Sequence, residues 1–323
     1  MVGVSRRTAF SLGAAALLAG RPAFAQTEAA PAPRGMVLVL NSGDATLSRL
    51  DPTTRAEIDR TPALREPHHI IRGPGDSGLI VADSGANEFL FVDPATGALR
   101  RRLRISNPYH LAMSPDGTGM IVLSLRRDQI DLYDTSDMRL VRRFAMPLKP
   151  SHPVYAPDGA MVFATLQGSG EVVAIDTATQ ELRWRSKVGR EPAGIAWAPN
   201  GLLVAGIMGS DHVAVINPDD GRLERRIVTG RGAHAVFPGP GGTLFVTNRV
   251  AGTISVLDGD TLAERHRYTT PGGPDCLAFA PDGKTLWYTR RWSQSVGVLD
   301  LDAGEVVATI PVGRSPHGIF FSA

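Results

Sequence analysis

Short apolar stretches separated by polar turns recur along the whole chain after residue 36. Each unit has the same order: an apolar strand, a P-D-G or P-N-G turn, a second strand, a polar loop, a third strand that ends in Asp, and a fourth strand. Residues 78–105, 120–146 and 243–269 show the last three strands in different copies. Helical periodicity is absent after residue 36, so the pattern predicts short β-strands throughout.

The turns and the strand interiors support this interpretation. Asp-Gly and Asn-Gly pairs favour tight hairpins because these turns need positive φ; they occur at 116–117, 158–159, 200–201 and 282–283. Apolar side chains on both faces of segments such as 172–177 are typical of strands packed between two neighbouring sheets. The chain therefore belongs to the all-β class.

The repeat period of 40 to 42 residues is that of a four-stranded propeller blade. Six complete units begin near residues 69, 110, 152, 194, 234 and 276, and a seventh is split between the two ends of the sequence. The C-terminal SPHGIFFSA supplies one inner strand, and residues 36–60 supply its three partners. We therefore predict a seven-bladed β-propeller of four-stranded antiparallel blades over residues 36–323, closed by pairing of the N- and C-terminal strands.

The first 25 residues have the pattern of an export signal. Arg6 and Arg7 precede a short apolar run, and Ala23-Phe24-Ala25 forms a small-residue cleavage site. SRRTAF resembles the twin-arginine signal, and the general secretory route and an uncleaved anchor are the alternatives. We predict a cleaved signal over 1–25, a flexible Pro/Ala-rich leader over 26–35, and a periplasmic location with no membrane span in the mature chain.

Charge and cysteine content narrow the classes of partner. The formal net charge is +2, and removal of the predicted signal takes away three arginines and no acid, which leaves about −1. No overall positive field then attracts nucleic acid, so nucleic-acid binding is disfavoured. Cys276 is the only cysteine, so an internal disulfide cannot form.

Four segments, RSPHGIFFS, APDGKTLWYT, TISVLD and VVATIPVG, resemble the YVTN-type seven-bladed propellers of the periplasm and cell surface. The resemblance covers residues 36–323. It implies the propeller fold but no single function, because that family includes nucleic-acid-binding, surface-layer and metal-handling members. The same pattern resembles the haem-bearing propeller of dissimilatory nitrite reductases.

The resemblance also implies that residues just after the recurrent proline lie where the innermost strand begins, near the mouth of the central channel. Aligned copies give two columns of such positions. The outer column holds His68, Tyr109, Ser151, Ala193, Ala233, Asp275 and His317. The inner column holds His69, His110, His152, Gly194, His234, Cys276 and Gly318. Six of the eight histidines and the only cysteine fall in these columns, so we expect them to meet in a ring.

Two interpretations of this ring stay open at the level of the sequence. In the first, the histidines belong to the repeat pattern itself and satisfy backbone groups of the loops. Alternatively, imidazole and thiolate donors converge on a transition metal, for which zinc and copper are the suitable ions. The predicted metal ligands are His69, His110, His152, His234 and Cys276.

A second set of residues lies in the loops that join the second and third strands of the blades. Solvated arginine loops are one interpretation, and a rim that recognises an anion through guanidinium groups and an aromatic face is the other. An anionic cofactor such as a haem-like tetrapyrrole would use this rim together with channel residues. The predicted cofactor-binding residues are His68, Tyr109, His317, Arg126, Arg127, Arg249, Arg290, Arg291 and Trp292.

Motifs of several enzyme classes are missing from the sequence. We find no G-x-S-x-G elbow, no phosphate-binding loop and no ring of carboxylates. We therefore expect a monomeric periplasmic binding protein rather than an enzyme, with a transition metal or an anionic metal-bearing cofactor at the channel mouth. The alternatives are a protein-interaction scaffold with structural histidines, and a propeller lyase or lactonase.

Overall fold

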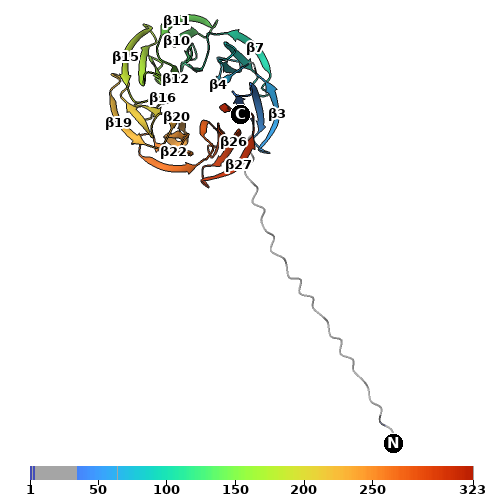
Figure 1. The fold of residues 1–323 in the computed structure, drawn as a ribbon. Coiled ribbons are helices and arrows are strands. Elements are labelled where there is room, and N and C mark those ends of the chain that lie inside the picture. The colour runs from blue at the N-terminus through green and yellow to red at the C-terminus, as the bar shows by residue number, and fades with distance from the viewer. Residues whose placement is uncertain (2, 4–34, 64, 323) are drawn as a thin grey trace. The chain divides into compact units, whose positions relative to one another are not determined.

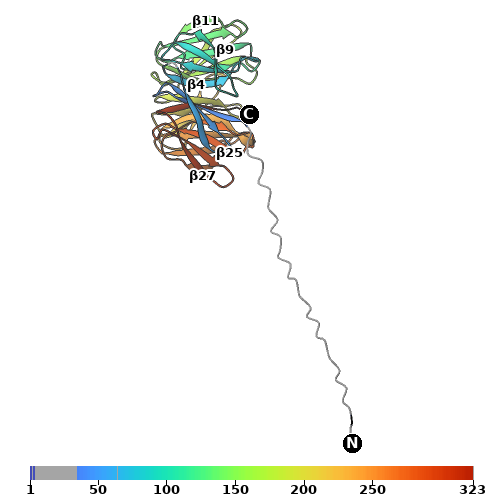
Figure 2. The same ribbon diagram turned by 90° about the vertical axis from the view of Figure 1, so that its right-hand side faces the viewer.

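The computed structural model describes residues 1, 3, 35–63 and 65–322 of the chain. Residues 36–322 form seven four-stranded antiparallel sheets arranged in a ring, seen along its axis in Figure 1 and from the side in Figure 2. This arrangement confirms the predicted seven-bladed propeller. The predicted export signal and leader lie almost entirely outside the described residues, so both stay predictions.

We number the blades in chain order and give their strands from the innermost to the outermost. Blade 1 consists of β28 (Pro316–Ser322), β1 (Met36–Asn41), β2 (Thr46–Asp51) and β3 (Ala56–Pro62). Blade 2 consists of β4 (Pro67–Arg72), β5 (Leu79–Asp83), β6 (Glu88–Val92) and β7 (Leu99–Arg104). Blade 3 consists of β8 (His110–Met113), β9 (Gly119–Ser124), β10 (Gln129–Asp134) and β11 (Arg139–Ala145).

The remaining four blades follow the same order. Blade 4 consists of β12 (Pro150–Tyr155), β13 (Met161–Leu166), β14 (Glu171–Asp176) and β15 (Glu181–Lys187). Blade 5 consists of β16 (Pro192–Trp197), β17 (Leu203–Ile207), β18 (His212–Ile216) and β19 (Leu223–Val228). Blade 6 consists of β20 (Ala233–Gly239), β21 (Thr243–Asn248), β22 (Thr253–Asp258) and β23 (Glu264–Thr269), with the 3-10 turn η1 (Pro240–Gly242) after β20. Blade 7 consists of β24 (Pro274–Phe279), β25 (Thr285–Arg290), β26 (Ser295–Asp300) and β27 (Glu305–Pro311).

Blade 1 joins the two ends of the propeller. Strand β1 pairs with β28 in antiparallel register, with Met36 opposite Ser322 and Val39 opposite Ile319. This pairing is the predicted ring closure, and it removes the exposed strand edge that an open array would present.

Apolar side chains from neighbouring blades form the core between the sheets. The cluster between blades 7 and 1 contains Val39, Leu50, Trp287 and Ile310, and the side chain of Trp287 is completely buried. The outermost strands are different, because β7 and β11 expose most of their residues and carry several arginines. Charged outer strands discourage edge-to-edge association with other chains.

Buried threonines connect the innermost strand of one blade to that of the next. Oγ1 of Thr289 accepts a hydrogen bond from the N–H of Cys276 at 2.9 Å and donates one to the carbonyl of His317 at 3.0 Å. In blade 4, Oγ1 of Thr165 accepts from the N–H of His152 at 3.1 Å and donates to the carbonyl of Ala193 at 2.7 Å. These contacts fix the spacing of neighbouring inner strands, on which the channel residues lie.

Strand register decides which loops share an end of the ring with the beginnings of the inner strands. In blade 7, Pro274 at the start of β24 lies opposite Arg290 at the end of β25. The loops between second and third strands therefore lie at the same end of the ring as the two residue columns. The P-D-G turns lie at the other end, and Gly117 and Gly283 in these turns have φ of 75° and 65°. No helix in the described part of the chain is long and apolar enough to cross a membrane.

Candidate metal centre

The inner strands bring six histidines together around the channel. His68 and His69 lie near the start of β4, His110 begins β8, His152 lies on β12, His234 on β20 and His317 on β28. Five of these side chains are buried, with exposed fractions of 0 to 6%, whereas His110 is only partly buried. Residues up to 249 positions apart in sequence therefore contact one another at this end of the ring.

Three of the predicted metal ligands form one compact group. The ring centroids of His69 and His110 are 3.6 Å apart, those of His110 and His152 are 4.9 Å apart, and those of His69 and His152 are 5.4 Å apart. One ring nitrogen from each histidine lies within 4.8 Å of the others. Two nitrogens bound to one zinc ion at ~2.0–2.1 Å are at most about 4 Å apart, so a small closure would bring these three onto one ion.

Protein groups engage the Nδ1 atom of each histidine in this triad. Nδ1 of His69 lies 2.7 Å from the Tyr109 carbonyl, which can only accept, so this nitrogen carries the proton. Nδ1 of His110 lies 2.8 Å from the N–H of Leu111 and 3.0 Å from its carbonyl, and Nδ1 of His152 lies 2.5 Å from Oγ of Ser151. Each Nδ1 is thus held by a protein group, and His69 shows the arrangement common among metal-binding histidines, in which Nδ1 donates and Nε2 is left for a ligand.

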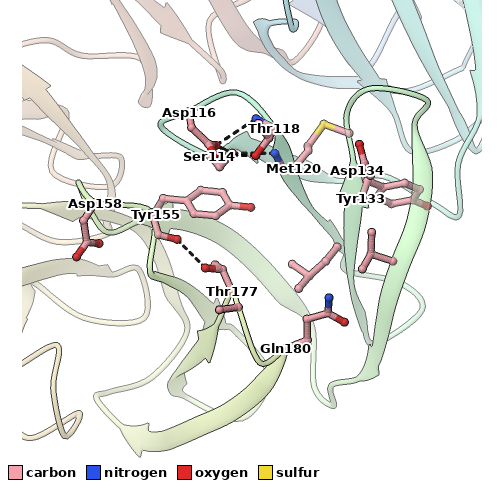
Figure 3. Close-up of a pocket in the computed structure, with 15 residues that line it drawn as sticks. Ser114, Asp116, Thr118, Met120, Tyr133, Asp134, Tyr155, Asp158, Thr177 and Gln180 are labelled. Atoms are coloured by element: carbon pink, nitrogen blue, oxygen red, sulfur yellow. Dashed lines mark hydrogen bonds between the residues drawn. The ribbon is translucent and has the colours of Figure 1, made fainter.

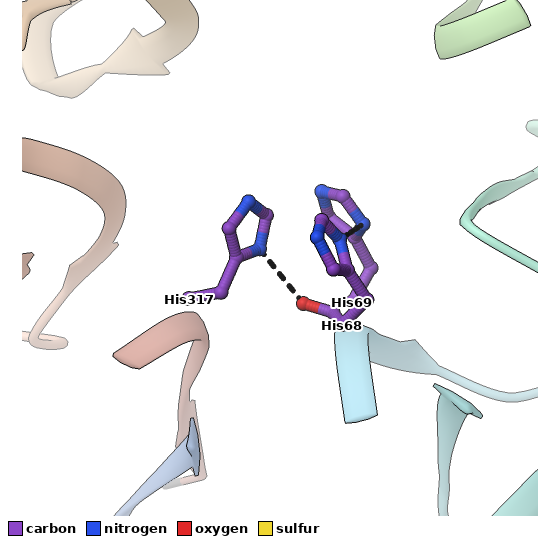
Figure 4. A group of neighbouring side chains, drawn as sticks. All are labelled: His68, His69 and His317. Atoms are coloured by element: carbon purple, nitrogen blue, oxygen red, sulfur yellow. Dashed lines mark hydrogen bonds between the residues drawn. The ribbon is translucent and has the colours of Figure 1, made fainter. Parts of the chain in front are cut away.

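The ring of His317 contacts both the ring and the backbone carbonyl of His68. The two rings have centroids 3.8 Å apart, and Nδ1 of His317 donates a hydrogen bond to the His68 carbonyl at 2.8 Å (Figure 4). Gly318 makes this approach possible, because a Cβ atom there would lie 2.8 Å from the same carbonyl oxygen. One nitrogen of His317 thus has the backbone-satisfying role that the structural interpretation assigns to the repeat histidines.

Asp275, at the start of β24, is the buried carboxylate of the ring. Nε of Arg249 donates to its Oδ1 at 3.1 Å, and Nη1 of Arg291 lies 3.3 Å from its Oδ2. Nδ1 of His234 is 3.0 Å from Oδ1, and Nε2 of His317 is 3.6 Å from Oδ2. One donor atom from each of His234, Asp275 and His317 lies within 4.8 Å of the others, which makes a second group with the composition of a metal site. A third such group, His68, His69 and His317, shares His69 with the triad and His317 with the second group.

Burial decides the protonation of these groups. Burial lowers the pKa of His69, His152 and His317 well below the usual value, and lowers those of His110 and His234 to about 4. The imidazoles are therefore neutral at pH 7, which is the form that binds metals. Burial opposes ionisation of Asp275, but the positive charge of Arg249 holds its pKa well below the usual range.

Two further residues of the columns, Tyr109 and Cys276, pack against other side chains of the protein. Burial raises the pKa of the Tyr109 hydroxyl to about 12, so it stays protonated beside the ring of His68, with centroids 4.1 Å apart. Cys276 packs in the apolar cluster between blades 7 and 1, and burial together with the charge of Asp275 raises its thiol pKa well above the usual value. Its Sγ lies 3.8 Å from Nδ1 of His317 and belongs to none of these donor groups.

The predicted arginine rim divides into residues with different partners. Among the predicted rim arginines in the described part of the chain, only Arg249 and Arg291 contact a residue of the ring, and that residue is Asp275. Arg126 pairs with Glu66 at 2.7 Å, and Arg290 donates to the Pro271 carbonyl at 2.8 Å and to Thr309 at 3.2 Å. Arg127 is exposed, and the exposed Trp292 lies over Gly273. The arginines therefore mostly bind groups of the protein itself.

A cavity of about 380 Å³ lies between blades 3 and 4, at the end of the ring that carries the P-D-G turns (Figure 3). Several of its polar groups are occupied by local hydrogen bonds: Asp116 accepts from Ser114 and Thr118, and Thr177 donates to the Gly159 carbonyl at 2.7 Å. Its polar lining thus belongs largely to turn structure, and we place the candidate site at the histidine ring.

Sequence comparison identifies the family of this propeller. The profile of the YNCE-like beta-propeller family matches residues 2–322, so the chain belongs to that family. No curated protein matches the sequence.

Solved structures that resemble the chain have varied descriptions. A functionally unknown protein from Desulfotomaculum acetoxidans has a TM-score of 0.77 and 13% identity, covering 89% of this chain and 99% of its own. The dihydro-heme d1 dehydrogenase NirN, in complex with DHE, has a TM-score of 0.67 and 18% identity, covering 94% and 77%. A putative 6-phosphogluconolactonase from Bacteroides uniformis has a TM-score of 0.69 and 19% identity, covering 89% and 99%. Identities this low establish a shared fold, and function must be argued from the site.

Proposed function

We propose that this protein is an exported periplasmic binding protein that holds a transition-metal ion at His69, His110 and His152. The observation that carries the proposal is the convergence of three neutral imidazoles from three blades, each with its Nδ1 engaged by a protein group. The proposed location rests on the twin-arginine-like N-terminus.

The donor set favours zinc or copper. Three imidazoles without a carboxylate suit zinc and copper and do not suit calcium or magnesium, which prefer oxygen ligands. A fourth coordination position would stay open, and the partly buried His110 lies on the accessible side of the triad. Such a site fits binding and transfer of an ion, or an ion that carries an additional small ligand.

A bare ion is favoured over a cofactor with several carboxylates. Such a cofactor would need free guanidinium groups, but Arg249 and Arg291 already contact Asp275, and Arg126 contacts Glu66. A tetrapyrrole would therefore have to replace several existing ion pairs.

The proposal is tested by metal analysis of untagged protein purified from the periplasmic fraction, together with its visible absorption spectrum. We expect zinc or copper in the protein as isolated, or its uptake by the chelator-treated protein in calorimetric titration. A protein with no metal that takes up none on titration would overturn the proposal, and a Soret-like band would point to the tetrapyrrole instead.

A matched pair of variants assigns the ion to the triad. His152→Ala should weaken binding of the ion at least ~10-fold, since a ligand is lost. His266→Ala is the control, because His266 lies on the outermost strand β23, where its ring meets that of Tyr268 edge-on. Strands β21 and β22 separate β23 from the innermost strand β20. Equal affinity in both variants would contradict the assignment.

A further inference from the structure

We propose that His234, Asp275 and His317 form a second transition-metal site, which takes a divalent cation beside the His69–His110–His152 triad. The two sites share no ligand. Their side chains are nevertheless neighbours, because the ring centroid of His69 is 4.6 Å from that of His317, and that of His152 is 5.4 Å from that of His234.

A hydrogen bond to the backbone fixes the tautomer of His317. Its Nδ1 lies 2.8 Å from the carbonyl oxygen of His68, and a carbonyl can only accept, so Nδ1 carries the proton. In the neutral ring, Nε2 then carries a lone pair. This lone pair is completely buried and has no hydrogen-bond partner among the described residues.

The lone pair on Nε2 of His317 lies close to the carboxylate of Asp275. Nε2 of His317 lies 3.6 Å from Oδ2 of Asp275, so two acceptor atoms face each other away from water. Nδ1 of His234 is similarly buried, 3.0 Å from Oδ1 but without the alignment of a hydrogen bond. A cation between these atoms would satisfy both nitrogens and the carboxylate at once, and two histidines with one carboxylate are a recognised donor set for divalent iron, manganese and zinc.

Neighbouring charges set the expected strength of this site. Arg249 and Arg291 both contact Asp275, so two positive charges already accompany its single negative charge. A divalent cation would be repelled by both arginines. We therefore expect the second ion to bind more weakly than the first, and expect removal of one arginine to strengthen its binding.

Oδ2 of Asp275 nevertheless has room for a metal. An ionised carboxylate offers about four lone-pair sites, and Arg249 donates two hydrogen bonds to Oδ1 whereas Arg291 donates one to Oδ2. The contact of Arg291 is the longer one, at 3.3 Å, and its side chain is 24% exposed, so this arginine can move aside. Arg249 would still hold the carboxylate in place through its hydrogen bonds to Oδ1.

The test counts zinc ions bound per chain in the chelator-treated full-length protein, by calorimetric titration with zinc chloride and elemental analysis. Wild type should bind two ions with different affinities, and Asp275→Asn should bind only the tighter one. His110→Ala should weaken the tighter ion at least ~10-fold and leave the affinity for the other unchanged. Circular dichroism and the thermal midpoint confirm that each variant is folded.

Other outcomes separate this proposal from the preceding one. A single ion that His110→Ala weakens and Asp275→Asn leaves unchanged would overturn the second site alone. A single ion with the opposite response would overturn the triad and support the second site. Failure to bind zinc at all would overturn both.

Arg291→Gln supplies a test that does not depend on removing a ligand. It should tighten the weaker ion at least ~3-fold, because one repulsive charge disappears while Arg249 still orients Asp275. A purely structural carboxylate predicts no such gain, so unchanged or weaker binding of the second ion would count against the site.

Discussion

The imidazole ring of His110 lies against that of His69, with ring centroids 3.6 Å apart and planes inclined by 32°. The two residues come from adjacent blades, 41 positions apart in sequence, and differ in exposure: His69 is 6% exposed, whereas His110 is only partly buried. An ion that enters the triad would therefore meet His110 first and His69 behind it.

His110→Ala should lower the affinity for zinc or copper at least ~10-fold, equivalent to about 1.4 kcal/mol, because one of three ligands is lost. The free energy of unfolding of the metal-free protein should change by less than about 1 kcal/mol, since His110 fills little of the apolar core. Calorimetric titration and urea unfolding measure the two effects. His212→Ala, in blade 5 outside the ring, is the matched control, and unchanged titration curves for His110→Ala would remove this residue from the site.

The buried histidines should make the metal-free protein sensitive to mild acid. Burial lowers the pKa of His110 and His234 to about 4 from an unfolded value near 6.5, so the unfolded chain binds more protons between these pH values. Their neutral forms therefore favour folding at pH 7, and this stability is lost as the pH falls from about 6.5 towards 4. For the fully buried His234 the complete effect is on the order of 3 kcal/mol.

Urea unfolding of the metal-free protein at several pH values between 7.5 and 4.5 measures this effect. We expect the unfolding free energy to fall with pH, and expect His234→Gln to reduce the slope. His266→Gln, on the outer strand β23, should leave the slope unchanged. A stability that does not vary over this range would contradict burial of neutral histidines in the ring.

The sequence was sufficient to predict the fold because the repeat carries several independent signals. Period, turn residues and apolar strands all indicated blades, and the split unit indicated closure through β28 and β1. Repeat alignment also placed His69, His110 and His152 in one column, and equivalent positions of a propeller lie around one channel.

The role of Asp275 could not be predicted in the same way. It is the only acid in its column, and its partners Arg249 and Arg291 come from loops of two different blades, so no spacing connects them. Neighbouring arginines were also indistinguishable in the sequence, although Arg290 donates to Pro271 while Arg291 contacts Asp275. Cys276 shares the histidine column, but packing against the adjacent blade determines its surroundings.

The buried threonine that joins blades 7 and 1 should make a measurable contribution to stability. Thr289→Val preserves the shape of the side chain but leaves the N–H of Cys276 without its bond to Oγ1 and the His317 carbonyl without one of its donors. Unsatisfied buried polar groups cost about 1–3 kcal/mol each, so we expect a loss of about 2 kcal/mol in the free energy of unfolding. Thr61→Val on the exposed strand β3 should cost less than about 0.5 kcal/mol. Equal effects in urea unfolding would show that the connection contributes little.

Closure of the ring by β28 should be the main determinant of stability at the chain ends. Deletion of residues 317–323 would leave β1 without its inner partner and expose Val37, Leu38 and Val39, which are completely buried. We expect a loss on the order of 5 kcal/mol or more, seen as a lower urea midpoint or as aggregation through the open edge in size-exclusion chromatography. Removal of residues 1–33 should have little effect.

A milder pair of variants tests closure if the truncated chain does not fold. Ile319 pairs with Val39 and is 6% exposed, so Ile319→Ala should lower the free energy of unfolding by about 2–5 kcal/mol. Val307 lies on the outer strand β27 and is 40% exposed, so Val307→Ala should cost less than about 1 kcal/mol. The larger loss at Ile319 is expected because its side chain packs between blades 7 and 1, where the two ends of the chain hold the ring shut. Similar losses for the two variants would contradict a special role of this seam in stability.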